Sequence, residues 1–101
     1  MAVMDDPEIT LCCLLWAHPG AEEALVAYED RVLALLSDHG IRLELRATGD
    51  GAHGRPVETQ IYRIPNRAAL EAYMADPRRT EHADERDRVI ARTELFPVTL
   101  R

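Results

Sequence analysis

Apolar residues follow two different periods along this chain. Residues 9–16 form a nearly continuous apolar run between turn residues, a pattern typical of a central strand that is covered on both faces. Residues 41–46 alternate between apolar and charged side chains, which predicts a strand with one buried face. Residues 57–64 alternate as well, so Glu58, Gln60 and Tyr62 are expected to share one face of a third strand.

The stretches between these strands carry apolar residues at helical spacing. Residues 21–39 have an apolar stripe, and Gly40 supplies a left-handed stop for the helix. Asn66 is expected to cap a short helix that runs through residue 74. Asp76, followed by Pro77, is expected to cap a longer helix that runs to about residue 91.

The last apolar segment, residues 94–100, again alternates and predicts a fourth strand. Pro97 lacks a backbone donor, so this strand is expected at an edge of the sheet. The order strand, helix, strand, strand, helix, strand is that of the ferredoxin-like βαββαβ class, an α+β fold with two helical segments on one face of a four-stranded antiparallel sheet. We expect residues 1–101 to form one domain.

The predicted first strand is apolar on both sides, so the face of the sheet opposite the helices needs a cover of its own. The sheet of a second copy is the simplest cover, because equal surfaces pack about a two-fold axis. A homodimer through the sheet faces is therefore expected.

Composition and charge exclude several classes of function. The net charge of -6 argues against a nucleic-acid partner, which requires a basic face. The longest apolar run is too short to span a bilayer and the first eight residues are acidic, so we expect a cytoplasmic protein without a membrane role. The chain has no lysine and a single serine outside any nucleophile motif, which excludes Schiff-base and serine-hydrolase chemistry. Its two cysteines and four histidines have no zinc-ligand spacing, so no metal is expected.

Polar residues on otherwise apolar faces indicate a polar cleft between the helices and the sheet. His82 and Arg86 lie four residues apart on the apolar stripe of the last predicted helix. His82 is the candidate acid or base, Arg86 the candidate for stabilising negative charge, and Tyr62 a hydrogen-bond donor. The alternatives are a histidine bonded to a backbone carbonyl and an ion pair of Arg86 with Glu58 or another acid. Further side chains expected to contact a ligand are Trp16, Tyr28, Arg46, Glu58 and Gln60.

From residue 9 to residue 98 the chain resembles the dimeric α+β barrel superfamily, in which two ferredoxin-like sheets pack face to face. The most characteristic run is IYRIPNRAALEAYMADPRRTEHADERDRV, with the family's strand, turn, "DP" break and helix with an inward histidine. The segment LSDHGIRLELR is similar to the helix end, glycine and second strand of small members of this superfamily.

By this resemblance, His82 matches the helix histidine that lines the cleft in antibiotic-biosynthesis monooxygenases, haem-degrading enzymes and plant polyketide cyclases. Haem-degrading members add an asparagine on the first strand and a tryptophan early in the second helical region. This chain has neither, since Trp16 lies on the first strand itself. No haem or other cofactor is therefore expected.

The resemblance implies a small-molecule cleft, and a cofactor-free monooxygenase or cyclase acting on an aromatic or polyketide-like metabolite. The alternative is a non-catalytic module that binds a metabolite or only assembles, because one fold hosts many functions.

Overall fold

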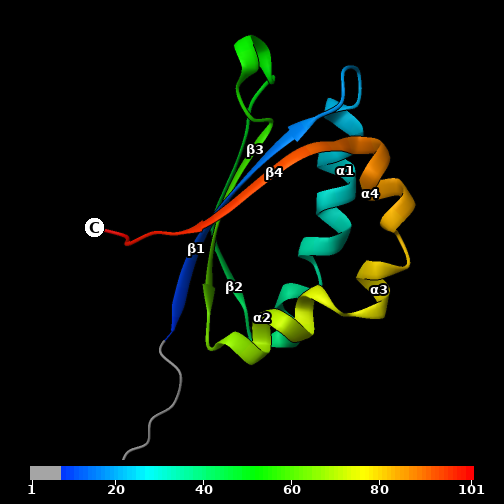
Figure 1. Ribbon diagram of the computed structural model, residues 1–101. Helices are drawn as coiled ribbons and strands as arrows, with labels where there is room; N and C mark the ends of the chain where they lie inside the picture. The colour runs from blue at the N-terminus through cyan, green and yellow to red at the C-terminus, as the bar shows by residue number, and fades with distance from the viewer. Residues whose placement is uncertain (1–7) are drawn as a thin grey trace, which may run out of the picture.

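The computed structural model describes residues 8–101. Four strands form one antiparallel sheet in the order β2-β3-β1-β4. The elements along the chain are β1 (Ile9–Ala17), α1 (Glu22–Leu33), the 3₁₀ helix η1 (Leu36–His39), β2 (Arg42–Thr48), the 3₁₀ helix η2 (Ala52–Gly54), β3 (Glu58–Ile64), α2 (Arg67–Met74), α3 (Pro77–Thr80), α4 (Ala83–Val89) and β4 (Ile90–Pro97). All four α-helices lie on one side of the sheet (Figure 1). The predicted ferredoxin-like α+β fold is confirmed.

The helix-facing side of the sheet carries the core. Paired residues of antiparallel strands project to the same face, so Leu11, Cys13 and Leu15 of β1 share this side with their β3 partners Tyr62, Gln60 and Glu58. Two apolar clusters fill the space above it. One packs Cys13 and Leu15 against α1, and the other packs Leu11 against α2 and η1.

The opposite side of the sheet carries the alternate residues of the same strands. These include Cys12, Leu14, Trp16, Ile61 and Phe96. No helix of the described part of the chain covers this side (Figure 1). The central position of β1 between β3 and β4, and the edge position of β4 with Pro97, are as the sequence predicts.

Both predicted helix caps are present. Asn66 accepts a hydrogen bond from the Ala69 backbone N–H, and Asp76 accepts one from that of Arg78. Gly40 ends η1 with a positive φ of 70°. Among the described helices, none combines the length and apolar character needed to span a bilayer.

The helix predicted over residues 21–39 is shorter than expected. The regular helix α1 ends at Leu33, and the remainder tightens into η1. Backbone bonds from Leu35 to Val32 and from Asp38 to Leu35 span three residues instead of four. This tightening keeps Leu36 in the core cluster next to Leu33.

The long helix predicted from Asp76 to about residue 91 was wrong in two respects. A turn at Glu81 and His82 separates α3 from α4. The chain then enters β4 directly at Ile90, which pairs with Ala17 of β1, so the strand begins four residues earlier than the predicted start at residue 94. Pairing with β1 overrides the helical periodicity of residues 89–91.

Candidate functional site

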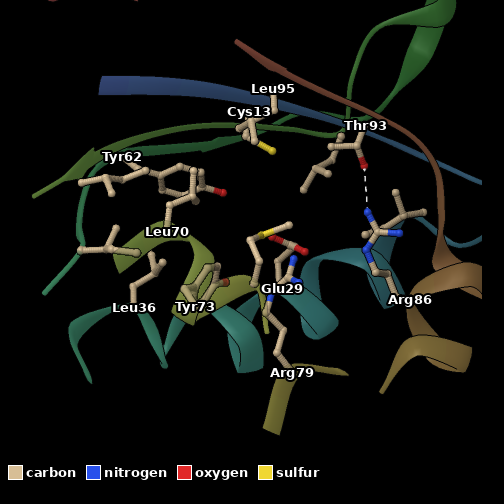
Figure 2. Close-up of a pocket in the computed structure, with 15 residues that line it drawn as sticks. Cys13, Glu29, Leu36, Tyr62, Leu70, Tyr73, Arg79, Arg86, Thr93 and Leu95 are labelled. Carbon is tan, nitrogen blue, oxygen red and sulfur yellow. Dashed lines mark hydrogen bonds between the residues drawn. The ribbon is translucent and has the colours of Figure 1, made fainter. Parts of the chain in front are cut away.

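A cavity lies between the helix-facing side of the sheet and the helices (Figure 2). Its volume is about 70 Å³, enough for several waters or a small ligand. Apolar side chains, among them Leu36, Ile41 and Leu70, form much of its wall. The polar and ionisable residues that line it are Cys13, Glu29, Tyr62, Tyr73, Arg79, Arg86 and Thr93.

The amide of Gln60 organises the polar side of this cavity. It lies on β3 and is fully buried. Its Nε2 donates to Oε1 of Glu29 and to Oε1 of Glu58, both at 2.8 Å, while its Oε1 accepts a hydrogen bond from the Tyr62 hydroxyl. Both N–H donors and the oxygen of the amide therefore have hydrogen-bond partners, and these bonds hold the three neighbouring side chains in position.

Glu58 does not reach the cavity. It is fully buried and is bound by Arg46, whose Nε and Nη2 lie 2.8 and 2.6 Å from its two carboxylate oxygens. Arg46 also contacts Asp30, at 2.5 Å, and the backbone carbonyl of Val26. This bidentate ion pair neutralises the charge of Glu58 and fixes the position of the hydrogen-bond network that holds Glu29.

Glu29 brings a buried carboxylate to the cavity wall. Its place on α1 follows from the apolar stripe of that helix, because it lies one turn after Leu25 and one turn before Val32 and Leu33. Burial raises the pKa of Glu29, the Gln60 hydrogen bond lowers it, and the charge of Glu58 raises it. A buried carboxyl group with a raised pKa at a cavity wall is a candidate acid or base.

Tyr62 and Cys13 face the same space as neutral groups. Burial raises the pKa of the Cys13 thiol to about 11. Burial likewise raises the pKa of the Tyr62 hydroxyl far above its usual range. Neither group ionises near neutral pH, so each contributes shape and hydrogen bonding to the cavity.

Two arginines enter the cavity from the side of α3 and α4. Arg79 extends from α3 and stacks over the ring of Tyr73 at 5.0 Å (Figure 2). Within residues 8–101, the polar contacts of Arg86 on α4 are a long one of 3.4 Å with the Thr93 hydroxyl and a 4.0 Å approach to Asp87. The Arg86 side chain is 37% exposed, so it lies where the cavity meets solvent.

Of the three predicted catalytic residues, the cavity contains Tyr62 and Arg86 but not His82. The prediction that His82 lies on an inward helix stripe was wrong. His82 is the residue before α4, in the turn that interrupts the predicted helix, and its side chain is 42% exposed beside Glu81, at 3.6 Å. The suggested pair of Arg86 with Glu58 is also absent, since Arg46 occupies Glu58.

None of the other predicted ligand contacts is among the residues that line the cavity. Gln60, Glu58 and Arg46 form the buried network behind it. Tyr28 is buried on α1, and its hydroxyl has no hydrogen-bond partner among the described residues. Trp16 projects from the opposite side of the sheet, where its Nε1 donates to the Gly54 carbonyl and Arg92 stacks on its ring at 4.3 Å.

Sequence reasoning missed Glu29, Arg79, Cys13 and Tyr73. The signal for Glu29 was present, because a carboxylate on the apolar stripe of α1 requires a buried partner. Arg79 could not be found in this way, since its direction depends on the break between α3 and α4. Within residues 8–101, no group of three or more His, Cys, Asp or Glu residues is arranged to hold a metal ion. The absence of haem, flavin and metal stays a prediction.

Comparisons with known proteins define the fold class. No family model and no curated protein matches the sequence. A solved protein of unknown function from Rhodopseudomonas palustris is 17% identical, with a TM-score of 0.74 over 96% of this chain and 85% of the other. A Bacteroides thetaiotaomicron protein described as an antibiotic biosynthesis monooxygenase is 15% identical, with a TM-score of 0.73 over 93% and 90% of the two chains.

A NIPSNAP family protein of unknown function from Agrobacterium tumefaciens is 18% identical, with a TM-score of 0.71 over 97% of this chain and 92% of the other. At these identities the likeness establishes a shared fold. The fold that the resemblance to the dimeric α+β barrel superfamily implies is therefore confirmed.

Proposed function

We propose that the cavity binds a small, largely apolar molecule of aromatic or polyketide-like character, and that Glu29 acts on it as a general base without a cofactor. The observation that carries this proposal is the position of Glu29. It is a buried carboxylate at a cavity wall, oriented by Gln60 and not neutralised by a direct ion pair with any described residue. Burying such a carboxylate lowers the stability of the fold, and groups of this kind are typical of sites that transfer protons.

The proposed chemistry begins with removal of a proton from an acidic carbon or hydroxyl of the substrate. The electron pair left behind forms an enolate or carbanion, and the positive charge of Arg86 stabilises it. In a cyclisation this carbanion attacks a carbonyl carbon of the same molecule. In an oxygenation it reacts with O₂ at a methylene carbon, and one oxygen atom remains as a carbonyl while the other leaves as water.

Tyr62 supports this reaction by holding Gln60, which in turn holds Glu29. The acid or base role first assigned to His82 passes to Glu29, because the His82 side chain lies outside the cavity lining. The structural neighbour described as an antibiotic biosynthesis monooxygenase supports oxygenation as one form of the reaction.

The competing function is a non-catalytic module that binds a metabolite or only assembles. One observation favours it. Tyr62, Gln60, Glu29 and Glu58 satisfy one another without a ligand, as the polar groups of a structural core would.

The test separates the two functions by following proton exchange. Acetophenone is an aryl ketone whose methyl protons exchange slowly in D₂O, and NMR measures both its binding and its rate of deuteration. We expect wild-type protein to bind it and accelerate exchange, with a rate that rises with pH as Glu29 loses its proton. Glu29→Gln should retain binding and lose about 10²-fold or more of the acceleration.

Glu23→Gln is the matched control, because Glu23 is an exposed residue of the same helix. Equal exchange in wild-type protein and in Glu29→Gln would remove Glu29 as the base. Binding without any acceleration would leave the non-catalytic module as the better account.

We also propose that the domain, residues 1–101, functions as a homodimer through the uncovered side of its sheet. The apolar residues of that side, Cys12, Leu14, Ile61 and Phe96 among them, support this assembly.

A further inference from the structure

We propose that the ligand of this cavity is a small apolar monocarboxylic acid, whose carboxylate is bound by Arg79 and Arg86. The inference rests on the proposed small-molecule cavity and names the class of ligand that it takes. Two guanidinium groups without adequate partners among the described residues carry it.

Arg79 is the first of these groups. It lines the cavity, yet among residues 8–101 it forms no ion pair, and its Nε is buried without a hydrogen-bond partner. Its position over the Tyr73 ring orients the guanidinium plane. A buried guanidinium donor left without an acceptor is costly, and a bound carboxylate would supply that acceptor.

Arg86 is the second. Its two polar contacts among residues 8–101, 3.4 Å to the Thr93 hydroxyl and 4.0 Å to Asp87, are both long for hydrogen bonds of a guanidinium group. Asp87 is itself highly exposed, so water screens that approach. Glu85, on the same helix, is bound by Arg31 instead.

The balance of charge favours an anion here although the whole chain carries a net charge of -6. Two guanidinium groups face a single carboxylate, Glu29, among the residues that line the cavity. Glu29 accepts a hydrogen bond from Gln60, and within residues 8–101 it forms no ion pair with either arginine.

The walls define the rest of the ligand. Leu36, Ile41, Leu70 and Met74 contribute apolar surface to the cavity wall, and Leu36 and Leu70 lie at the end away from Arg86 (Figure 2). A volume of about 70 Å³ limits the enclosed part of the ligand to a group about as large as one aromatic ring. An apolar monocarboxylate fits this combination of a cationic end and an apolar body.

Benzoate and benzamide provide the test, because they share a ring and a shape and differ in charge. Titration of ¹⁵N-labelled protein followed by NMR measures both affinities, with acetophenone as a third probe. We expect benzoate to bind about tenfold or more tightly than benzamide, with the resonances of residues around Arg79 and Arg86 shifting most.

Substitution of the two arginines tests whether they bind the carboxylate of benzoate. Arg79→Gln and Arg86→Gln should each weaken benzoate about tenfold and leave benzamide unchanged, whereas Arg88→Gln, an exposed arginine on the same helix as Arg86, should change neither.

Equal affinity for benzoate and benzamide would overturn the inference, and acetophenone binding in the same experiment would show that the proposed cavity function survives. Benzoate selectivity without accelerated exchange of acetophenone would support the inference while removing the general base. Binding of none of the three probes would overturn both.

Discussion

Strand β3 presents two buried polar residues, Glu58 and Gln60, where a strand of this kind would ordinarily place apolar side chains against the helices. Burying a carboxylate is costly unless its charge is paired and its oxygens are hydrogen-bonded. Arg46 and Gln60 meet both conditions for Glu58. The hydrogen-bond network beside the cavity is thus formed by the folded protein itself, without a ligand.

This dependence predicts an unequal cost for removing two arginines of β2. Arg46→Ala should lower the free energy of unfolding by about 3–5 kcal/mol, because it leaves the charge of Glu58 buried without its partner. Arg42→Ala should cost less than about 1 kcal/mol, since Arg42 pairs with Glu44 while 70% exposed. Urea denaturation followed by circular dichroism measures both, and equal costs would contradict the role given to Arg46.

The candidate site could be predicted from sequence only in part, and the reason lies in single residues. Tyr62 and Gln60 were identified because strand alternation places them on one face. His82 was misplaced because a helical period was extended through a turn. Glu29 was overlooked although its position on an apolar stripe was visible, and Arg79 depends on tertiary packing that no local pattern records.

At the scale of elements, local signals placed the helix starts and three strands well. Asn66 and Asp76 cap α2 and α3 because their side chains accept backbone N–H groups within the next three residues. The break before α4 and the early start of β4 could not be predicted, because both follow from pairing of Ile90 with Ala17, more than 70 residues away in sequence.

Asp76 also ties η1 to the start of α3. Its carboxylate accepts hydrogen bonds from the Arg78 side chain and from Nε2 of His39, the latter at 2.8 Å, and these bonds hold the pKa of Asp76 well below its usual range. A lowered folded-state pKa gives stability that is present above the unfolded-state pKa and is lost as the pH falls.

Asp76→Asn should therefore melt at a lower temperature than wild type at pH 7, although asparagine still caps a helix. The difference should narrow as the pH falls below about 4, where the wild-type protein begins to lose the same contribution. Asp38→Asn is the control, because Asp38 also contacts Arg78 but is more than half exposed. A difference in melting temperature that persists unchanged into acid would contradict this charge-based account.

At the scale of the whole molecule, the two sides of the sheet are unequal. The helix-facing side holds the core and the cavity, while the other side presents apolar residues that no described helix covers (Figure 1). Leu11 and Leu14 illustrate the division, since Leu11 lies in the helix-side core and Leu14 on the uncovered side. An uncovered apolar sheet face is a surface for association.

The proposed homodimer predicts the mass of the protein in solution and the effect of a charge on the uncovered face of the sheet. Light scattering at micromolar concentration should give about twice the chain mass of 11.4 kDa. Phe96→Asp should give a folded monomer, because Phe96 is 38% exposed on the edge strand β4 and a charge there opposes burial against a second copy. Leu11→Asp, by contrast, should unfold the protein, since Leu11 is buried in the core. A wild-type monomer, or an unchanged dimer in Phe96→Asp, would remove this face as the interface.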